Sequence, residues 1–247
     1  ISRGLVGSEM CIRDRDHIVV VNYPSTTRVR QLLDELSSDP EHGGREFIIV
    51  ADEIEKLPFS MNRVSFVRGS PLQLETYQRA CLHNAKMALV LATSYSDGTS
   101  DAVVASAVSV INQLNADIHI VAECLDEKHR TLFESVDCDA VVPGMRIIGN
   151  LLAQEIHDPG VARMVDVITS NLEGDTLFTT QVGDQMEGAD YRDFAKRLLD
   201  SDINLMCVNR GQDSHTHYGG MRPTVGDILI YVATRRMSWS ELRAMGG

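Results

Sequence analysis

Polar residues follow several short apolar runs in the first half of the chain, and their types are suited to binding an anionic or phosphorylated ligand. Asp52 comes after the run FIIVA and could hold a ribose hydroxyl. Ser25 and Thr26 precede a helical pattern, whose N-terminus could hold one anion. Arg68 adds a positive charge for such a ligand. The residues predicted to bind ligand are Asn22, Ser25, Thr26, Asp52, Arg68, Gly69, Ser70, Thr93 and Glu123.

The loop after the first apolar run does not favour a dinucleotide. Such a site needs G-x-G-x-x-G, so that backbone N–H groups can approach a pyrophosphate. The sequence at 22–27 reads NYPSTT, without a glycine, and Pro24 also removes one N–H donor. Binding of an NAD-type cofactor is therefore the less favoured interpretation. The cofactor stays unknown, with a nucleotide as one candidate.

Motifs for catalysis or metal binding are missing from the sequence. It contains no G-x-S-x-G, H-E-x-x-H or P-loop pattern. His215 and His217 have only Asp213 at ligand spacing, so a solvated loop is the favoured interpretation. The five cysteines form no C-x-x-C pair, and we expect reduced thiols. Four acidic residues are interpreted as helix caps or first-turn charges rather than cation ligands: Asp97, Asp101, Asp126 and Glu127. We predict no catalytic residue, no metal site and no enzymatic activity.

Composition and charge restrict the class of protein. Hydrophobic residues make up 43% of the 247 residues and charged residues 23%, which is typical of a globular protein. The formal net charge of -12 excludes a nucleic-acid backbone as a favoured partner. No window approaches the ~20 apolar residues of a membrane helix. The chain could still be one end of a protein whose membrane part lies elsewhere.

Residues 1–15 differ in character from the rest. They lack an initiator Met and show neither helical nor strand periodicity. The stretch GLVGSEMCIRDR resembles a translated library adapter. We therefore expect a non-native segment here and a natural protein that extends upstream.

From residue 16, apolar runs alternate with helical patterns. Residues 29, 32, 33 and 36 are apolar at the spacing of one buried helix face. Parallel strands buried on both faces read as uninterrupted apolar runs. Strands are predicted at 17–21, 47–50, 64–67, 87–92, 118–123 and 139–142. This order predicts a Rossmann-like, doubly wound parallel sheet over 16–144, with the ligand site at the carboxyl ends of its strands.

After Pro143 the pattern changes. Residues 145–170 predict a helix pair with a turn at Pro159-Gly160, and the first helix carries adjacent apolar pairs at 147–148 and 151–152. Such a surface is wider than one core-facing stripe. It is explained either by a helix wedged between two subdomains or by a helix that packs against a partner. Residues 171–247 predict a small α+β subdomain.

This order of elements resembles the RCK or KTN domains, regulators of potassium conductance, of potassium channels and Trk-type uptake systems. The resemblance covers residues 16–243. It is carried by HIVVV, the acidic end of FIIVAD, V-x-G-x-P at 67–71, IHIVAE at 118–123, DAVV-P at 139–143, Asn209-Arg210-Gly211, and Gly226-Asp227 entering ILIYV.

The resemblance implies a gating-ring module on the cytoplasmic side of the cell membrane, which senses a cytosolic ligand and controls potassium transport. It implies a homodimer, then a larger ring, attached to a pore domain encoded upstream or in a separate chain. The implied interface residues are Ile147, Ile148, Leu151, Leu152 and Met164. An NAD(P)-binding oxidoreductase and a free-standing nucleotide-binding regulatory subunit are the alternatives.

Two departures from the family limit what the resemblance implies about ligands. The nucleotide-binding loop is degenerate, as in the RCK domains of Slo-type channels, and Ser70 stands where an Asp is frequent. Of the positions that resemble the calcium site of calcium-gated relatives, Glu123 is acidic, but Ala92 and Leu125 are not. Neither NAD nor calcium is therefore expected from the family.

Overall fold

The computed structural model describes residues 16–172, 174–184 and 190–246. The chain divides into two compact units, which are described separately: residues up to Ser37 with Glu41–His157, and Ser38–Pro40 with the chain from Asp158 onward. None of the helices in these described ranges is long and apolar enough to cross a membrane.

The first unit is built on a six-stranded parallel sheet with the order β3-β2-β1-β4-β5-β6. Its strands are β1 (Ile18–Val21), β2 (Phe47–Ala51), β3 (Val64–Arg68), β4 (Met87–Val90), β5 (His119–Cys124) and β6 (Ala140–Pro143). Val19 pairs with Ile48 on one side and Ala88 on the other, which places β1 at the centre. All four β1 residues are buried, in agreement with their uninterrupted apolar run. The predicted doubly wound sheet is confirmed.

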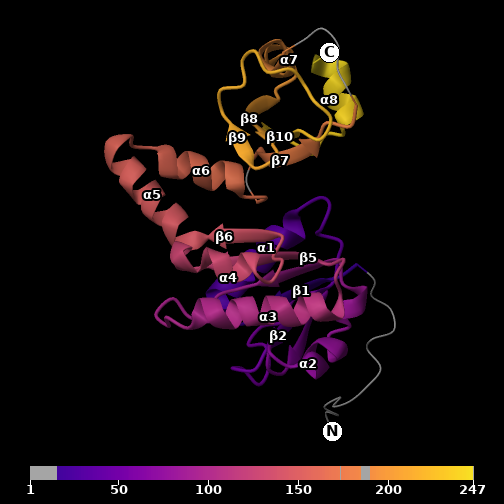
Figure 1. The fold of residues 1–247 in the computed structure, drawn as a ribbon, viewed down its shortest axis with the longest axis vertical. Coiled ribbons are helices and arrows are strands. Elements are labelled where there is room, and N and C mark those ends of the chain that lie inside the picture. The colour runs from indigo at the N-terminus through magenta and orange to yellow at the C-terminus, as the bar shows by residue number, and fades with distance from the viewer. Residues whose placement is uncertain (1–15, 173, 185–189, 247) are drawn as a thin grey trace. The chain divides into compact units, whose positions relative to one another are not determined.

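Helices cover both faces of this sheet. They are α1 (Thr26–Ser38), α2 (Leu74–Arg79), α3 (Ser100–Leu114) and α4 (Arg130–Glu134), with short 3-10 turns η2 (Leu82–Asn84) and η3 (Glu127–His129). The helix α5 (Gly144–His157) follows β6 and extends away from the sheet (Figure 1). Val29 and Leu33 of α1 pack into the core on one face. Val104, Val108 and Ile111 of α3 pack into the core on the other, where α3 runs across the sheet (Figure 1).

The connection after β3 contains a proline that does not start a helix. Proline favours the first turn of a helix, yet α2 begins only at Leu74, three residues after Pro71, and ends at Arg79. The start is delayed because the chain first makes a turn, in which the Gln73 N–H donates to the Ser70 carbonyl over 3.2 Å. Cys81 then takes a left-handed backbone conformation with φ 52°, which separates α2 from η2.

Replacing Gly69 by alanine is expected to lower the free energy of unfolding by about 1–3 kcal/mol, the usual cost of overpacking. A Cβ atom at Gly69 would lie 2.5 Å from Oγ1 and 2.9 Å from Cγ2 of Thr76, whose side chain is buried and cannot move into solvent. Gly98 has open space at the same position, so Gly98→Ala is the matched control. Urea unfolding followed by circular dichroism measures both variants. Equal urea midpoints for Gly69→Ala and Gly98→Ala would contradict a close contact between residue 69 and Thr76.

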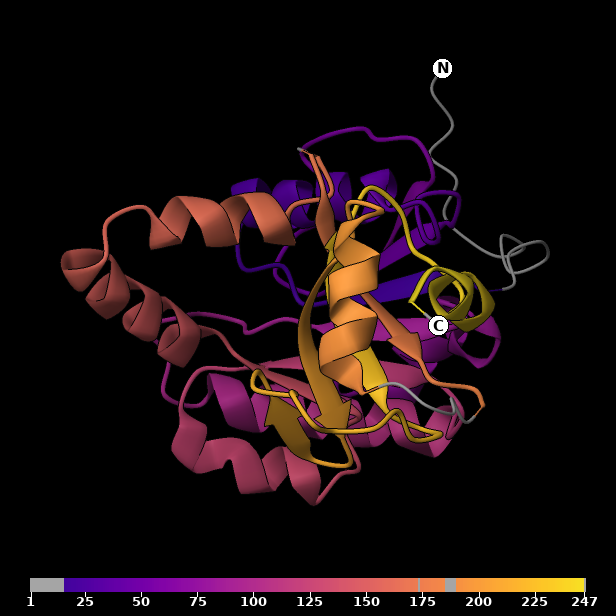
Figure 2. The ribbon, with the colours of Figure 1, turned by 90° about the horizontal axis from the view of Figure 1, so that it is seen from above.

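The second unit carries α6 (Val161–Thr169) and a four-stranded antiparallel sheet with the order β7-β10-β8-β9. The strands are β7 (Thr176–Gln181), β8 (Asn204–Arg210), β9 (Asp213–His215) and β10 (Ile228–Ala233). Two helices complete it, α7 (Tyr191–Leu199) and α8 (Trp239–Gly246), and α7 lies across the strands (Figure 2). Phe194, Leu229 and Tyr231 are fully buried at its core. The predicted α+β fold is confirmed, whereas β9 and α8 were not predicted.

The cysteines of the described ranges are of two kinds. Cys124, Cys138 and Cys207 are free thiols, as expected. Cys81 is disulfide-bonded, so the prediction of reduced thiols is wrong for this residue. Burial, followed by the nearby Asp101 and Glu127 carboxylates, raises the pKa of Cys124 to about 11. This thiol is therefore protonated near neutral pH and is a poor nucleophile.

Candidate ligand site

Asn22 connects three strand ends at the edge where the ligand site was predicted. It is fully buried and has a left-handed backbone with φ 73°. Its Nδ2 donates to the Leu91 carbonyl over 2.7 Å, and its backbone N–H donates to the Val50 carbonyl over 2.9 Å. Its Oδ1 is buried without a hydrogen-bond partner in the described part of the chain. Asn22 thus fixes the ends of β1, β2 and β4 relative to one another.

The hydroxyls of Ser25 and Thr26 contact residues of their own helix start. The Arg28 N–H donates to Ser25 Oγ over 3.3 Å, and the Tyr23 hydroxyl donates to Thr26 Oγ1 over 3.1 Å. Ser25 thereby acts as a helix cap. Thr93 is similarly occupied, because its N–H and its Oγ1 both donate to Ser100 Oγ, over 3.0 and 3.2 Å.

The ends of β2 and β3 bring a second group of predicted residues together. The Gly69 N–H donates to the Ala51 carbonyl over 2.9 Å, which places Gly69 beside Asp52. The Arg68 guanidinium lies 3.9 Å from a carboxylate oxygen of Glu55. Ser70 Oγ accepts from the Leu72 N–H over 3.3 Å. Asp52 and Arg68 are exposed, so this part of the predicted site is an open surface.

Glu123, at the end of β5, is the most strongly constrained of the predicted residues. Only 7% of its side chain is exposed. Its Oε1 accepts from Arg28 Nη2 over 2.6 Å and from the Tyr95 hydroxyl over 3.1 Å. Its Oε2 accepts from the Ala92 N–H over 2.9 Å. The Arg28 guanidinium also lies 4.9 Å from the centre of the Tyr95 ring, within range of a cation–π interaction.

Arg28 and Tyr95 were not among the residues predicted from the sequence. The position of Arg28 in the sequence was nevertheless informative. It lies in the first turn of α1, where the helix dipole disfavours a cation. A cation at this position indicates a carboxylate partner nearby. Burial first, and then Glu123, raise the pKa of Tyr95, so its hydroxyl stays a donor at neutral pH.

A cavity of about 370 Å³ lies beside this cluster, within the first unit. Its apolar wall is formed by Leu32 of α1, Leu89, Val121 and Val142 of the sheet, and Ile147 and Ile148 of α5. Arg28, Tyr95 and Glu123 make its polar side. The structure describes every residue that was predicted to bind ligand. Of these residues, Glu123 alone lines the cavity.

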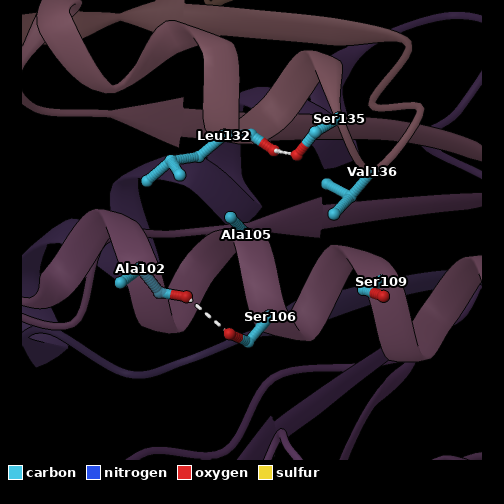
Figure 3. A pocket seen from close by; sticks show the side chains of 7 residues that line it. All are labelled: Ala102, Ala105, Ser106, Ser109, Leu132, Ser135 and Val136. Atoms are coloured by element: carbon cyan, nitrogen blue, oxygen red, sulfur yellow. Dashed lines mark hydrogen bonds between the residues drawn. The ribbon is translucent and has the colours of Figure 1, made fainter.

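A second hollow, of about 380 Å³, lies between α3 and α4 (Figure 3). Two of its three serine hydroxyls bond to carbonyls of their own chain segment. Ser106 Oγ donates to the Ala102 carbonyl and Ser135 Oγ donates to the Leu132 carbonyl, each over 2.7 Å. The hollow has no charged side chain in its lining, so it is a weaker candidate than the cavity beside Glu123.

Asp101, interpreted from the sequence as a first-turn charge of a helix, anchors the loop after β5. It accepts from the Leu125 and Asp126 N–H groups over 2.8 and 2.9 Å, and its Oδ2 lies 2.9 Å from His129 Nδ1. Burial alone would raise the pKa of Asp101, but these hydrogen bonds outweigh it and lower the pKa. The described residues contain no group of three or more His, Cys, Asp or Glu that could hold a metal ion.

The predicted interface helices α5 and α6 contain no buried residue within the described part of the chain. Ile147 and Ile148 are each about half exposed, Leu152 is 65% exposed and Met164 is 46% exposed. Leu151 is half-buried. Each of the two helices, taken by itself, thus exposes apolar side chains.

The chain is similar in sequence or fold to several known proteins. Residues 13–122 match the family model of the calcium-activated potassium channel slowpoke-like RCK domain. The calcium-gated potassium channel TvoK of Thermoplasma volcanium is 18% identical over 233 residues, which are 93% of this chain and 65% of TvoK. The human SLO3 gating ring superimposes with a TM-score of 0.67 at 14% identity, over 93% of this chain and 46% of that one.

The chain thus spans less than two thirds of these relatives. The predicted resemblance is confirmed by the family match, and the SLO3 gating ring shows that the fold extends through both units. Residues 13–122 are therefore similar to an RCK domain, a regulator of potassium conductance, of the slowpoke-like type.

Proposed function

We propose that this chain is the cytoplasmic regulatory, gating-ring module of a potassium channel or transporter, and not an enzyme. The match of residues 13–122 to the slowpoke-like RCK family carries this proposal. The relatives are named as a calcium-gated potassium channel and a gating ring. A module of this kind converts ligand binding into a force on a pore, so it needs a ligand site and an assembly surface.

The proposal assigns assembly to the apolar side chains of α5 and of α6. Ile147, Ile148, Leu151, Leu152 and Met164 meet the same residues of a second copy in a two-fold contact, and dimers associate further into a ring. The exposure of the apolar side chains of α5 supports the proposal, since monomeric proteins rarely expose large apolar patches.

The ligand of the proposed module is not calcium at Glu123. Both carboxylate oxygens of Glu123 already accept hydrogen bonds, from Arg28, Tyr95 and the Ala92 N–H. Ca²⁺ takes six to eight oxygen ligands, and neither Ala92 nor Leu125 supplies a side-chain oxygen. An anionic ligand at the exposed strand ends, between Asp52 and Arg68, remains part of the proposal, with Asn22, Ser25, Thr26, Gly69, Ser70 and Thr93 around it.

Removal of residues 16–247 is expected to change potassium flux by at least about five-fold, the lower end of allosteric coupling between two sites. The test expresses the gene with its genomic upstream sequence, or with a neighbouring pore gene, in a bacterial strain without potassium uptake of its own. Flux is measured in membrane vesicles that hold equal amounts of the pore protein, with and without the domain.

Unchanged flux, or the absence of any pore sequence upstream or nearby, would contradict the proposal. Reproducible NADH- or NADPH-dependent turnover by the purified protein would instead favour the oxidoreductase alternative. If the pore is encoded in a separate chain that co-purifies with this one, the free-standing regulatory subunit is the correct form of the proposal.

A further inference from the structure

The cavity beside Glu123 has the size and wall of a small-molecule site. Its volume of about 370 Å³ falls within the roughly 300–1,000 Å³ typical of such sites. Leu89, Val121 and Val142 project from β4, β5 and β6 on the sheet face that carries α1, and Val142 is still 42% exposed. Ile147 and Ile148 close the cavity from α5. An apolar occupant would remove these side chains from water.

The polar side of the cavity lacks one hydrogen-bond acceptor. Arg28 Nη2 donates to Glu123, but Arg28 Nη1 is buried and has no partner in the described part of the chain. A buried donor without an acceptor is costly, and native proteins rarely retain one. Glu123 cannot relieve it, because its two oxygens accept from Arg28 Nη2, Tyr95 and Ala92. An oxygen atom of the occupant would supply the missing acceptor.

The charges at the polar side of the cavity decide whether the occupant's acceptor is charged or neutral. The Arg28 guanidinium and the Glu123 carboxylate are 2.6 Å apart and cancel. An anionic occupant would approach the Glu123 carboxylate, and a cationic one would approach Arg28, so either would meet a like charge in a poorly hydrated place. A neutral carbonyl or hydroxyl oxygen avoids both costs.

We propose that this cavity binds a neutral, mainly apolar small molecule whose single carbonyl or hydroxyl oxygen accepts a hydrogen bond from Arg28 Nη1. An aliphatic side chain of a second copy would fill the apolar part but would leave this donor unpaired. The idea that this molecule regulates a pore rests on the proposed function, whereas its binding to the chain is independent of it.

The test titrates the full chain, labelled with ¹³C at Leu, Val and Ile methyl groups, with three probes of similar shape. Acetophenone is neutral and carries an acceptor, α-methylstyrene lacks the acceptor, and benzoate carries a charge. The methyl signals of Leu32, Val121 and Ile148 are expected to shift and saturate with acetophenone. The affinity for α-methylstyrene is expected to be weaker by about five-fold, the contribution of one hydrogen bond. The affinity for benzoate is expected to be weaker because its charge approaches the Glu123 carboxylate.

Three variants test whether binding occurs in the cavity. Val121→Phe fills it and is expected to abolish the shifts, whereas Ser109→Phe, which alters the hollow between α3 and α4, is expected to leave them unchanged. Arg28→Met combined with Glu123→Gln removes the donor without leaving a lone buried charge. This variant is expected to bind acetophenone and α-methylstyrene equally. The unaffected methyl signals of the core report whether each variant is folded.

Each other outcome overturns the inference. Benzoate binding more tightly than acetophenone would make the cavity an anion site. No saturable shift with any probe, together with dissociation of a dimer by Val121→Phe, would assign the cavity to a second copy. Equal affinity of the wild type for acetophenone and α-methylstyrene would remove the role of Arg28. Because these measurements need no pore, a failed flux experiment would leave the binding site intact and refute only its regulatory use.

Discussion

Replacing Leu151 and Leu152 together by aspartate is expected to convert a dimer of this protein into monomers. Burial of a leucine side chain stabilises by about 1.5–3 kcal/mol, and a two-fold contact loses the leucines of both copies. The aspartates add like charges that face one another across the axis. A loss of several kcal/mol raises the dissociation constant by several powers of ten. The variant is therefore expected to be monomeric at the concentrations used for sedimentation.

Sedimentation of residues 16–247 measures the state of the wild type and of the double variant. Asn150→Asp is the matched control, because it adds a charge to the same helix at an exposed polar position and is expected to leave the dimer intact. Circular dichroism shows whether the variants keep their helices. A wild-type protein that stays monomeric at tens of micromolar would contradict the proposed assembly surface.

Replacing Asp227 by alanine is expected to destabilise the second unit by about 3 kcal/mol. Asp227 is 2% exposed and accepts from Arg210 Nε and Nη2, each over 2.8 Å, from the Tyr191 hydroxyl over 2.6 Å and from the Thr224 N–H over 3.0 Å. Removing one partner of a buried ion pair typically costs about 3–5 kcal/mol. The lower end applies here, because the Arg210 side chain is 41% exposed and can be rehydrated.

The effect of this substitution is expected to depend on pH. Burial alone would raise the pKa of Asp227, but the bonds from Arg210, Tyr191 and Thr224 outweigh it and lower the pKa below the ordinary value. A carboxylate with a lowered pKa in the folded state stabilises fully above its unfolded pKa of about 3.9. This stabilisation is lost as the pH falls through the lower folded value.

Urea unfolding followed by the fluorescence of Trp239, the single tryptophan of the chain, reports on the unit that contains Asp227. The difference between wild type and Asp227→Ala is expected in full at pH 7 and to shrink below about pH 4. Asp213→Ala, at an exposed position of β9, is the control and is expected to change little. A difference that stays constant down to pH 3 would contradict the role of the ionised carboxylate.

The parallel sheet could be predicted because its central strands are buried on both faces, which produces apolar runs such as HIVVV. The short strand β9 could not, because its three residues are polar and at least partly exposed, and they pair only through tertiary contact with β8. The delayed start of α2 depends on a turn whose hydrogen bonds do not follow from residue type.

The candidate site was predictable in part. Glu123 could be placed because it follows a strand whose carboxyl end must face the ligand edge. Its partner Arg28 is 95 residues away, and no local pattern joins the two. The cavity was not foreseeable either, since it depends on where α5 leaves the sheet. Ile147 and Ile148, assigned from their pairing in sequence to an interface, also form part of the cavity wall.

The junction between β6 and α5 has a mechanical consequence. β6 ends at Pro143 and α5 begins at Gly144, so no linker residue separates sheet from helix. A Cβ at Gly144 would lie 3.3 Å from Glu123 Oε1, which places this junction directly on the carboxylate. At 1.5 Å per residue, the 14 residues of α5 span about 21 Å. A tilt of about 10° at the junction would therefore move the far end of α5 by about 4 Å.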